Sequence, residues 1–260
     1  PPREQCDLTK PSQLVVTMDG TRPTLVLNCA AYTKVDLAEK EKDLANEINA
    51  KGVGNLAHTC HSRGVPIVHF STDYVFDGTV NRPLQPTDPV GPKGVYGLSK
   101  LLGERMLQEF RPPRWLILRT AWLYGPGGPN FVQTMLNAAK AGKPLKVIDD
   151  QVGCPTFTYD LAEATLALLE TDATGIYHMS NSGQTNWFEF TQAIMDEFGV
   201  TPASLDPLKS ADWKAMRPDS ATRPAYSVLD VTPYEQKTGR KMPDWRDGLR
   251  RYRELLAASA

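Results

Sequence analysis

Short apolar runs alternate with amphipathic stretches along the first half of the chain. The runs at 25–30, 66–70 and 115–119 predict buried strands. Between the first two, apolar residues recur at a helical period from Leu44 to Cys60, with Gly64 as a stop. Residues 95–110 predict another helix. Strands that alternate with helices of this length predict an α/β fold with a parallel sheet and right-handed crossovers.

The rest of the chain predicts shorter elements. Residues 77–94 are rich in Pro and Gly and predict a loop, and the first 24 residues show no strong pattern, with Gly20 in a turn-like setting. Strands are expected at 145–148 and 176–179. Helices are expected at 131–141 after an Asn130 cap, at 160–170, from the Asn186–Glu189 capping box to Gly199, from Thr232 to Gly239, and after Asp244.

Charge and cysteine content narrow the class of protein. In 260 residues, 29 Lys and Arg face 30 Asp and Glu, which argues against nucleic acid or a membrane surface as the main partner. No apolar run is long enough to span a membrane, and the opening PPREQCDLTKPSQL does not look like a targeting signal. Four widely spaced cysteines favour reduced thiols in a cytoplasmic protein. The four histidines show no ligand spacing, so no metal site is predicted.

Candidate chemistry begins with Tyr96 and Lys100, four residues apart on one face of the predicted helix. An ammonium near a phenol lowers the pKa of the phenol toward neutrality, so Tyr96 could exchange a proton with a carbonyl oxygen. A surface helix pair is the alternative, because this spacing alone is common.

Polar and small residues follow three predicted strands, and ligands bind at such strand ends in doubly wound sheets. The second strand ends in STDYVFDG, where the hydroxyl of Thr72 could bond the same oxygen as Tyr96. The first ends in NCAAY, where small side chains admit a flat ligand, and the third ends in RTAWLYG.

These stretches carry a family resemblance. NCAAYTKVDLAE, STDYVFDG, VYGLSKLLGE, LRTAWLYGPGGPNFV, VIDDQVGCPT and ATRPAYSVLD are similar to the dTDP-4-dehydrorhamnose reductases, a branch of the extended short-chain dehydrogenase/reductases. The resemblance covers nearly the whole chain. It implies a Rossmann-type doubly wound parallel sheet at 1–121 and 157–181, with a smaller substrate domain at 122–156 and 182–260. It also implies reduction of dTDP-4-dehydro-β-L-rhamnose to dTDP-β-L-rhamnose by NADPH or NADH.

The resemblance implies roles for particular residues. Tyr96 would protonate the C4 oxygen, Lys100 would hold the nicotinamide ribose and tune Tyr96, and Thr72 would orient the sugar. The cofactor would also meet the residues at the first strand end and, at its adenine end, an early acidic turn: Ala30, Ala31, Tyr32, Asp7 and Leu8. The nucleotide sugar would meet Asp73, Trp122, Asn130, Trp187 and Arg223. A homodimer is compatible with the resemblance, and a need for Mg²⁺ does not follow from the residues.

Several of these residues have a purely structural alternative. Trp122 could be core, Trp187 could pack the start of its helix, and Arg223 before a proline could be a solvated loop residue. Asp7 could be an ordinary loop acid, and the Asp149–Asp150 pair suggests a turn before it suggests a metal.

The sequence departs from the family pattern at its start. The family opens with a strand and a glycine-rich turn that binds the cofactor diphosphate on backbone N–H groups, and residues 1–24 contain no such turn. The expectation is an N-terminally incomplete sheet. A non-catalytic regulatory subunit of the same fold is therefore an alternative function, although intact Thr72, Tyr96 and Lys100 argue against it. A related nucleotide-sugar epimerase or dehydratase is a second alternative; a dehydratase would need an Asp-Glu pair where this chain has Asp73-Tyr74.

Overall fold

A four-stranded parallel sheet forms the centre of the first part of the computed structural model, which describes residues 1–258. Its strands, in spatial order, are β1 (Val26–Asn28), β2 (Ile67–Thr72), β3 (Trp115–Thr120) and β8 (Gly175–His178). Every neighbouring pair is parallel, as the alternation of strands and helices predicts. β1 is one edge of the sheet, and its Leu27 is 49% exposed.

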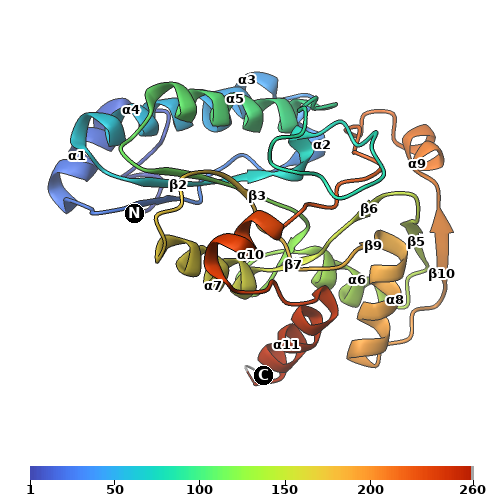
Figure 1. Ribbon diagram of the computed structural model, residues 1–260. Coiled ribbons are helices and arrows are strands. Elements are labelled where there is room, and N and C mark those ends of the chain that lie inside the picture. The colour runs from blue at the N-terminus through green and yellow to red at the C-terminus, as the bar shows by residue number, and fades with distance from the viewer. Residues whose placement is uncertain (259–260) are drawn as a thin grey trace.

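Helices cover both faces of this sheet, so the doubly wound α/β prediction is confirmed (Figure 1). Alternate strand residues face opposite sides: Ile67 and Ile117 pack toward one set of helices, whereas Val68 and Leu118 pack toward the other. The first set comprises α1 (Pro11–Thr21), α2 (Val35–Ala38), α3 (Lys42–Asn46), α4 (Val53–Arg63) and α5 (Val95–Phe110). The second comprises α7 (Thr158–Leu169) and α10 (Thr232–Thr238).

Two features of the first part differ from the prediction. Residues 11–21 form the helix α1, with Gly20 inside it rather than in a turn. Leu14 and Met18 are buried one turn apart, and this packing stabilises a helix that its sequence marks only weakly. The long helical stretch before Gly64 is also interrupted, because α3 and α4 are joined by a π-helical turn at Glu47–Gly52.

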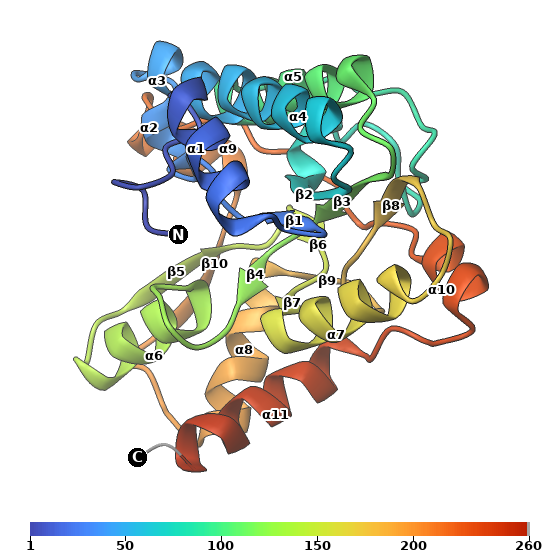
Figure 2. The same cartoon turned by 90° about the vertical axis from the view of Figure 1, so that its left-hand side faces the viewer.

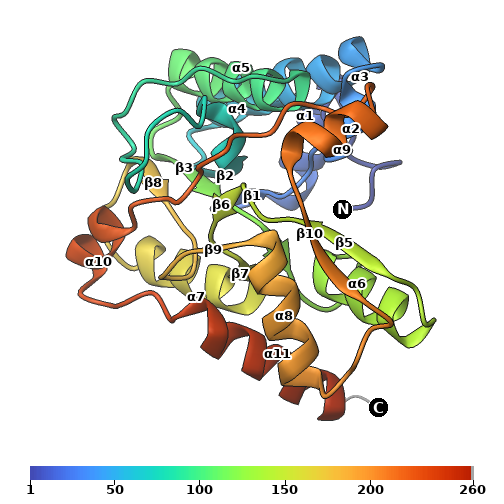
Figure 3. The same ribbon diagram turned by 90° about the vertical axis from the view of Figure 1, so that its right-hand side faces the viewer.

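The second part packs around its own apolar cluster, which includes Leu136, Phe190, Trp245 and Tyr252. Figures 2 and 3 show α6, α8 and α11 around it, with the β5–β10 ribbon to one side. Its elements are β4 (Leu123–Tyr124), α6 (Phe131–Lys140), β5 (Leu145–Ile148), β6 (Val152–Gly153), β7 (Thr156–Phe157), β9 (Thr185–Asn186), α8 (Trp187–Phe198), β10 (Leu205–Leu208), α9 (Ser210–Met216) and α11 (Trp245–Ala258).

The predicted caps of this part are present. Asn130 Oδ1 accepts from the N–H of Gln133 at 3.1 Å, and Asn186 Oδ1 accepts from the N–H of Glu189 at 2.8 Å. The β10 strand and the α9 helix were not predicted. After α9 the chain runs back across the molecule to α10 and passes α2 (Figure 3).

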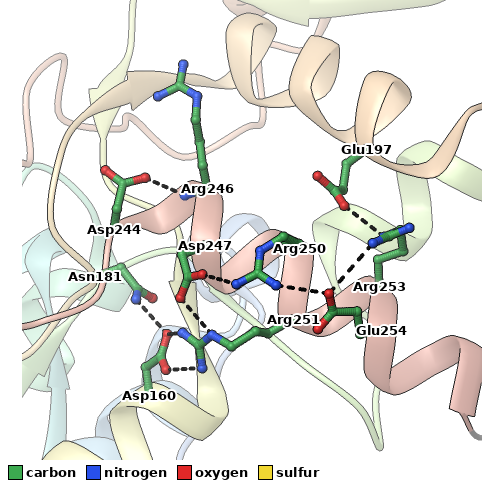
Figure 4. Close-up of polar contacts among 10 residues, drawn as sticks. All are labelled: Asp160, Asn181, Glu197, Asp244, Arg246, Asp247, Arg250, Arg251, Arg253 and Glu254. Atoms are coloured by element: carbon green, nitrogen blue, oxygen red, sulfur yellow. Dashed lines mark hydrogen bonds and ion pairs between the residues drawn. The ribbon is translucent and has the colours of Figure 1, made fainter.

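The C-terminal helix α11 is held by a network of ion pairs (Figure 4). The carboxylate of Asp160, on α7, is fully buried and accepts from Arg251 at 2.7 Å and from Asn181 at 2.6 Å. Arg251 also pairs with Asp247 one turn earlier. Within residues 1–258, no helix combines the length and the apolar character needed to cross a bilayer.

Candidate active site

The end of β2 fixes the hydroxyl of Thr72. Its Oγ1 donates to the Asp73 carboxylate at 3.0 Å and accepts from the N–H of Tyr74 at 3.2 Å. Residues 73–75 form a single 3₁₀ turn, so the polar residues after the strand turn toward α5 instead of continuing the sheet. Thr72 is buried and therefore keeps this orientation.

Tyr96 lies in the first turn of α5, facing Thr72. The Glu39 carboxylate accepts from the N–H of Val95 at 2.8 Å, which caps the helix start with a negative charge. The Tyr96 ring meets Tyr74 edge-on, with 5.8 Å between ring centroids, and Tyr96 also borders a small hollow walled by the 221–224 segment. The Thr72 hydroxyl is close enough to Tyr96 to lower the pKa of its phenol, so the structure brings these two predicted site residues together.

The pKa of Tyr96 is raised to about 12, which differs from the expected shift toward neutrality. Burial has the largest effect, and the negative charge of Asp73 adds to it, while the nearby hydroxyl of Thr72 opposes both. Lys100 does not lower the Tyr96 pKa as predicted, because its Nζ donates instead to the carbonyl of Phe70 at 2.6 Å. Tyr96 is thus a protonated phenol at neutral pH.

Lys100 is buried on the same face of α5, one turn after Tyr96. Burial lowers its pKa to about 8, and the opposing effect of Glu104 is smaller. The Nζ of Lys100 lies 3.5 Å from Nε2 of His69, a residue of β2. His69 is fully buried on β2, as expected for a core strand residue.

Asp73 is a buried carboxylate whose Oδ2 accepts no hydrogen bond of normal geometry among the described residues. Burial raises its pKa to about 6, against smaller lowering effects of the nearby Ser227 and Thr72 hydroxyls. An unpaired buried oxygen costs free energy unless a ligand donates to it. A sugar hydroxyl is a donor of the right kind.

The end of β1 presents small residues next to this cluster of side chains. Ala30 is exposed and Ala31 is half-buried, so their backbone is open to a flat ligand. Asn28 Oδ1 holds the N–H of Ala30 at 3.2 Å. Tyr32 is locked in place, because Asn49 bonds both its N–H and its carbonyl and its phenol donates to Glu41 at 2.8 Å.

Asp7 and Leu8, the two N-terminal residues predicted to contact the cofactor, make contacts within the protein. Asp7 accepts from the N–H and hydroxyl of Thr9 at 2.9 and 2.8 Å, and it pairs with Arg3 at 3.2 Å. The side chain of Leu8 lies in the core against Gly52, so only its backbone could meet a ligand.

Trp122 and Trp187, both predicted to contact the nucleotide sugar, lie against each other. The rings of Trp122 and Trp187 stack with centroids 3.5 Å apart and an interplanar angle of 9°. Trp122 has φ +48°, which is strained for a bulky residue, and such strain is concentrated at functional sites. Gly153 is required beneath it, because a Cβ there would lie 2.6 Å from the Trp122 ring.

Asn130 and Arg223 are already engaged within the protein. Asn130 caps α6, and its Nδ2 donates to the carbonyl of Gly125 at 2.9 Å. Arg223 pairs with Asp36 on α2 at 2.9 Å and lies close enough to Tyr74 to affect its pKa, so it is near the residue whose ring packs on Tyr96. Their contact with a substrate stays a prediction.

Sequence reasoning missed Asn49, which lies in the π-helical turn and also donates to Ser99 Oγ on α5 at 3.0 Å. It therefore connects the Tyr32 segment to the helix that carries Tyr96. The sequence signal that could have identified Asn49 is a polar amide side chain among the apolar positions of the predicted helix.

Asp149 and Asp150 lie in a turn, paired with Lys209 and Ser210, and no group of three metal-ligating side chains occurs in residues 1–258.

Comparisons with known proteins agree on one family. The family model of the RmlD substrate binding domain matches residues 1–257. The chain is 44% identical to the spore coat polysaccharide biosynthesis protein SpsK of Bacillus subtilis, over 89% of this chain and 79% of that protein. It is 38% identical to the dTDP-4-dehydrorhamnose reductase of Escherichia coli, over 98% and 87%. A crystal structure of dTDP-4-dehydrorhamnose reductase from Bacillus anthracis in complex with NADP superposes with a TM-score of 0.92 at 36% identity, covering 97% of this chain and 88% of that one.

Proposed function

The chain belongs to the family of the RmlD substrate binding domain, and from this membership we propose that it is an NAD(P)H-dependent dTDP-4-dehydrorhamnose reductase. Its reaction is the reduction of the C4 carbonyl of dTDP-4-dehydro-β-L-rhamnose to give dTDP-β-L-rhamnose. The observation that carries the proposal is the placement of Tyr96 beside the end of β2, where Tyr74 bonds the Thr72 hydroxyl and packs edge-on against Tyr96, with the buried Lys100 one helical turn further along α5.

Tyr96 is the proton donor in this proposal. With a pKa near 12 it is protonated at neutral pH, so it can give a proton to the C4 oxygen as that oxygen becomes an alkoxide. The Thr72 hydroxyl lies near the phenol and can bond the same oxygen if it turns from Asp73, to which it now donates at 3.0 Å. Thr72 is buried and Tyr96 is half-buried, which limits competing water and strengthens their interaction with the developing charge.

NAD(P)H supplies a hydride to the carbonyl carbon when it is bound. The residues at the end of β1 fit a flat ring and its ribose, because Ala30 is exposed and Ala31 has only a methyl group. We assign the contacts along this ligand to Ala30, Ala31, Tyr32, Tyr96 and Lys100, with Asp7 and the backbone of Leu8 toward its adenine end. The Lys100 ammonium uses one of its three donors on the carbonyl of Phe70, which leaves others for a ribose hydroxyl.

The nucleotide sugar is assigned to the opposite side of Tyr96. Asp73 Oδ2 would accept from a sugar hydroxyl, which removes the penalty of an unpaired buried oxygen. Trp122 and Trp187 present a stacked aromatic wall. Arg223 would exchange part of its pairing with Asp36 for the diphosphate, to which a guanidinium binds in a fork, and Asn130 supports the loop that ends at α6.

We propose that different segments of the chain bind the two ligands. Segments 1–121 and 157–181 bind the dinucleotide, and segments 122–156 and 182–260 bind the nucleotide sugar. The proposal places the protein in the cytoplasm, in keeping with its four free cysteine thiols.

A direct assay of cofactor oxidation, with identification of the product, tests the function. Purified protein is mixed with NADPH or NADH and dTDP-4-dehydro-β-L-rhamnose, the loss of reduced cofactor is followed by absorbance, and the sugar product is identified by NMR. Formation of dTDP-β-L-rhamnose supports the proposal. Binding of cofactor and sugar without any oxidation would contradict it and would favour a non-catalytic subunit.

A further inference from the structure

Helix α5, which carries Tyr96, has no capping side chain of its own. Its N-cap residue is Gly94, and its first turn contains no acidic residue. The first N–H groups of a helix have no partner inside the helix, and a Ser, Thr, Asp or Asn at the N-cap normally accepts from one of them. The start of α5 therefore needs an acceptor from another part of the chain.

Glu39, at the end of α2, supplies this acceptor. Its Oε1 accepts from the N–H of Val95, 56 residues further along the chain, at 2.8 Å. The carboxylate also fills the space that a side chain at Gly94 would need, because a Cβ there would lie 2.9 Å from the same oxygen. A negative charge at a helix N-terminus is favourable for the helix dipole. The absent side chain at position 94 and the carboxylate of Glu39 thus complement each other.

The same turn of α5 lies against the backbone that follows β2. A Cβ at Gly97 would collide with the carbonyl oxygen of Tyr74, so glycine is what lets the helix approach this closely. The ring of Tyr74 in turn meets the ring of Tyr96 edge-on. The bond from Glu39 to residue 95 and the close approach at residue 97 flank Tyr96 in the sequence, so together they place its side chain.

Glu39 is half-buried, and its neighbours in the sequence are themselves held. Before it, Asp36 accepts from the N–H of Ala221 at 2.9 Å. After it, Glu41 accepts from the phenol of Tyr32 at 2.8 Å. A group that positions another must itself be fixed by its surroundings, and these two contacts limit the movement of the segment that carries Glu39.

We propose that Glu39 is a positioning residue for the proton transfer: its bond to Val95 fixes the first turn of α5 and thereby the place of the Tyr96 phenol beside the end of β2. The inference rests on the proposed function only for its effect on turnover. Glu39 acts through the helix backbone. Loss of the cap should therefore lower kcat, which depends on where the phenol lies, and should leave the KM for the sugar unchanged.

Amide hydrogen exchange of the whole chain, followed by NMR, tests the cap without any need for activity. In the parent, the N–H of Val95 should be protected although it is the first of its helix, because it is bonded to Glu39. Glu39→Ala should speed its exchange about tenfold relative to Leu107, in the same helix, and this ratio separates the local effect from any loss of overall stability. Glu39→Gln keeps an acceptor oxygen and should keep most of the protection. An equal ratio in the parent and Glu39→Ala would overturn the proposal.

Kinetics test the consequence for Tyr96. Glu39→Ala should lower kcat about tenfold with an unchanged KM for the sugar, and Glu39→Gln should recover most of the parental kcat. Glu109→Ala, which removes an exposed carboxylate from the last turn of the same helix, is the matched control and should behave as the parent. A parental kcat in Glu39→Ala, or a Glu39→Gln protein as slow as Glu39→Ala, would refute the role. Inactivity of the parent would refute the proposed function alone, because the exchange result stands without it.

Discussion

Replacing Arg119 by Met should destabilise the protein strongly, because it leaves the buried carboxylate of Glu104 without its positively charged partner. The Glu104 carboxylate is 0% exposed, and Arg119, itself 3% exposed, donates to it through Nε at 3.0 Å and a terminal nitrogen at 2.7 Å. In Arg119→Met, the hydroxyl of Ser71 is the one donor to this carboxylate that remains among residues 1–258. Removing one partner of a buried pair costs about 3–5 kcal/mol, a large part of a typical total of roughly 5–15 kcal/mol.

Urea unfolding followed by circular dichroism measures this cost. The matched control is Arg63→Met: Arg63 also forms two bonds with a carboxylate, at 2.7 and 3.0 Å, but its partner Asp19 is 60% exposed. Exposed pairs contribute at most about 1 kcal/mol, so this variant should lose little stability. The double variant Glu104→Leu with Arg119→Met should recover most of the loss, since no charge remains unpaired. Equal losses in Arg119→Met and Arg63→Met would refute the reasoning.

Three further predictions concern Asp73, the α11 network and Lys100. The raised pKa of Asp73, about 6 against 3.8, means that the ionised group destabilises the fold above pH 6 and ceases to do so as pH falls toward its unfolded value. Asp73→Asn should therefore unfold with a free energy about 1–3 kcal/mol above the parent at pH 8, and the gap should shrink as the pH is lowered; a constant gap would contradict it. Arg251→Met leaves the buried carboxylate of Asp160 with Asn181 alone and should cost about 1–3 kcal/mol in urea unfolding, whereas Arg253→Met should cost below about 1 kcal/mol; equal costs would argue against the network in Figure 4. Lys100→Met should raise the Kd for NADPH, measured by calorimetry, and lower kcat by about 10²-fold; a change confined to the KM of the sugar would exclude contact with the ribose.

The central sheet was predictable because each of its strands is a continuous apolar run between turn-forming residues. α5 begins at the predicted Val95 and ends at Phe110, close to where its end was expected, since Pro112 and Pro113 limit it. α1 was missed because its sequence has little amphipathic character, and its helix depends on packing against the residues of α4. β10 was missed because Pro207 argues against a strand, yet the strand lies at the edge of a two-stranded ribbon.

For the site, spacing and strand ends were enough to place Thr72 and Tyr96 together. They were not enough to predict the pKa of Tyr96, since that depends on burial and on where Lys100 Nζ points, and neither follows from a four-residue spacing. The bonds of Asn49 and His69 join segments 17 and 31 residues apart, so only the folded chain reveals them.

The most direct test of the account is the turnover of Tyr96→Phe. This change removes the phenolic proton and keeps the ring that packs on Tyr74. Tyr159→Phe, at an exposed position, is the matched control. With dTDP-4-dehydro-β-L-rhamnose and NADPH, kcat of Tyr96→Phe should fall by about 10²–10⁴-fold with an unchanged circular dichroism spectrum, while Tyr159→Phe keeps the parental rate. Near-parental turnover by a folded Tyr96→Phe protein would show that Tyr96 is not the proton donor.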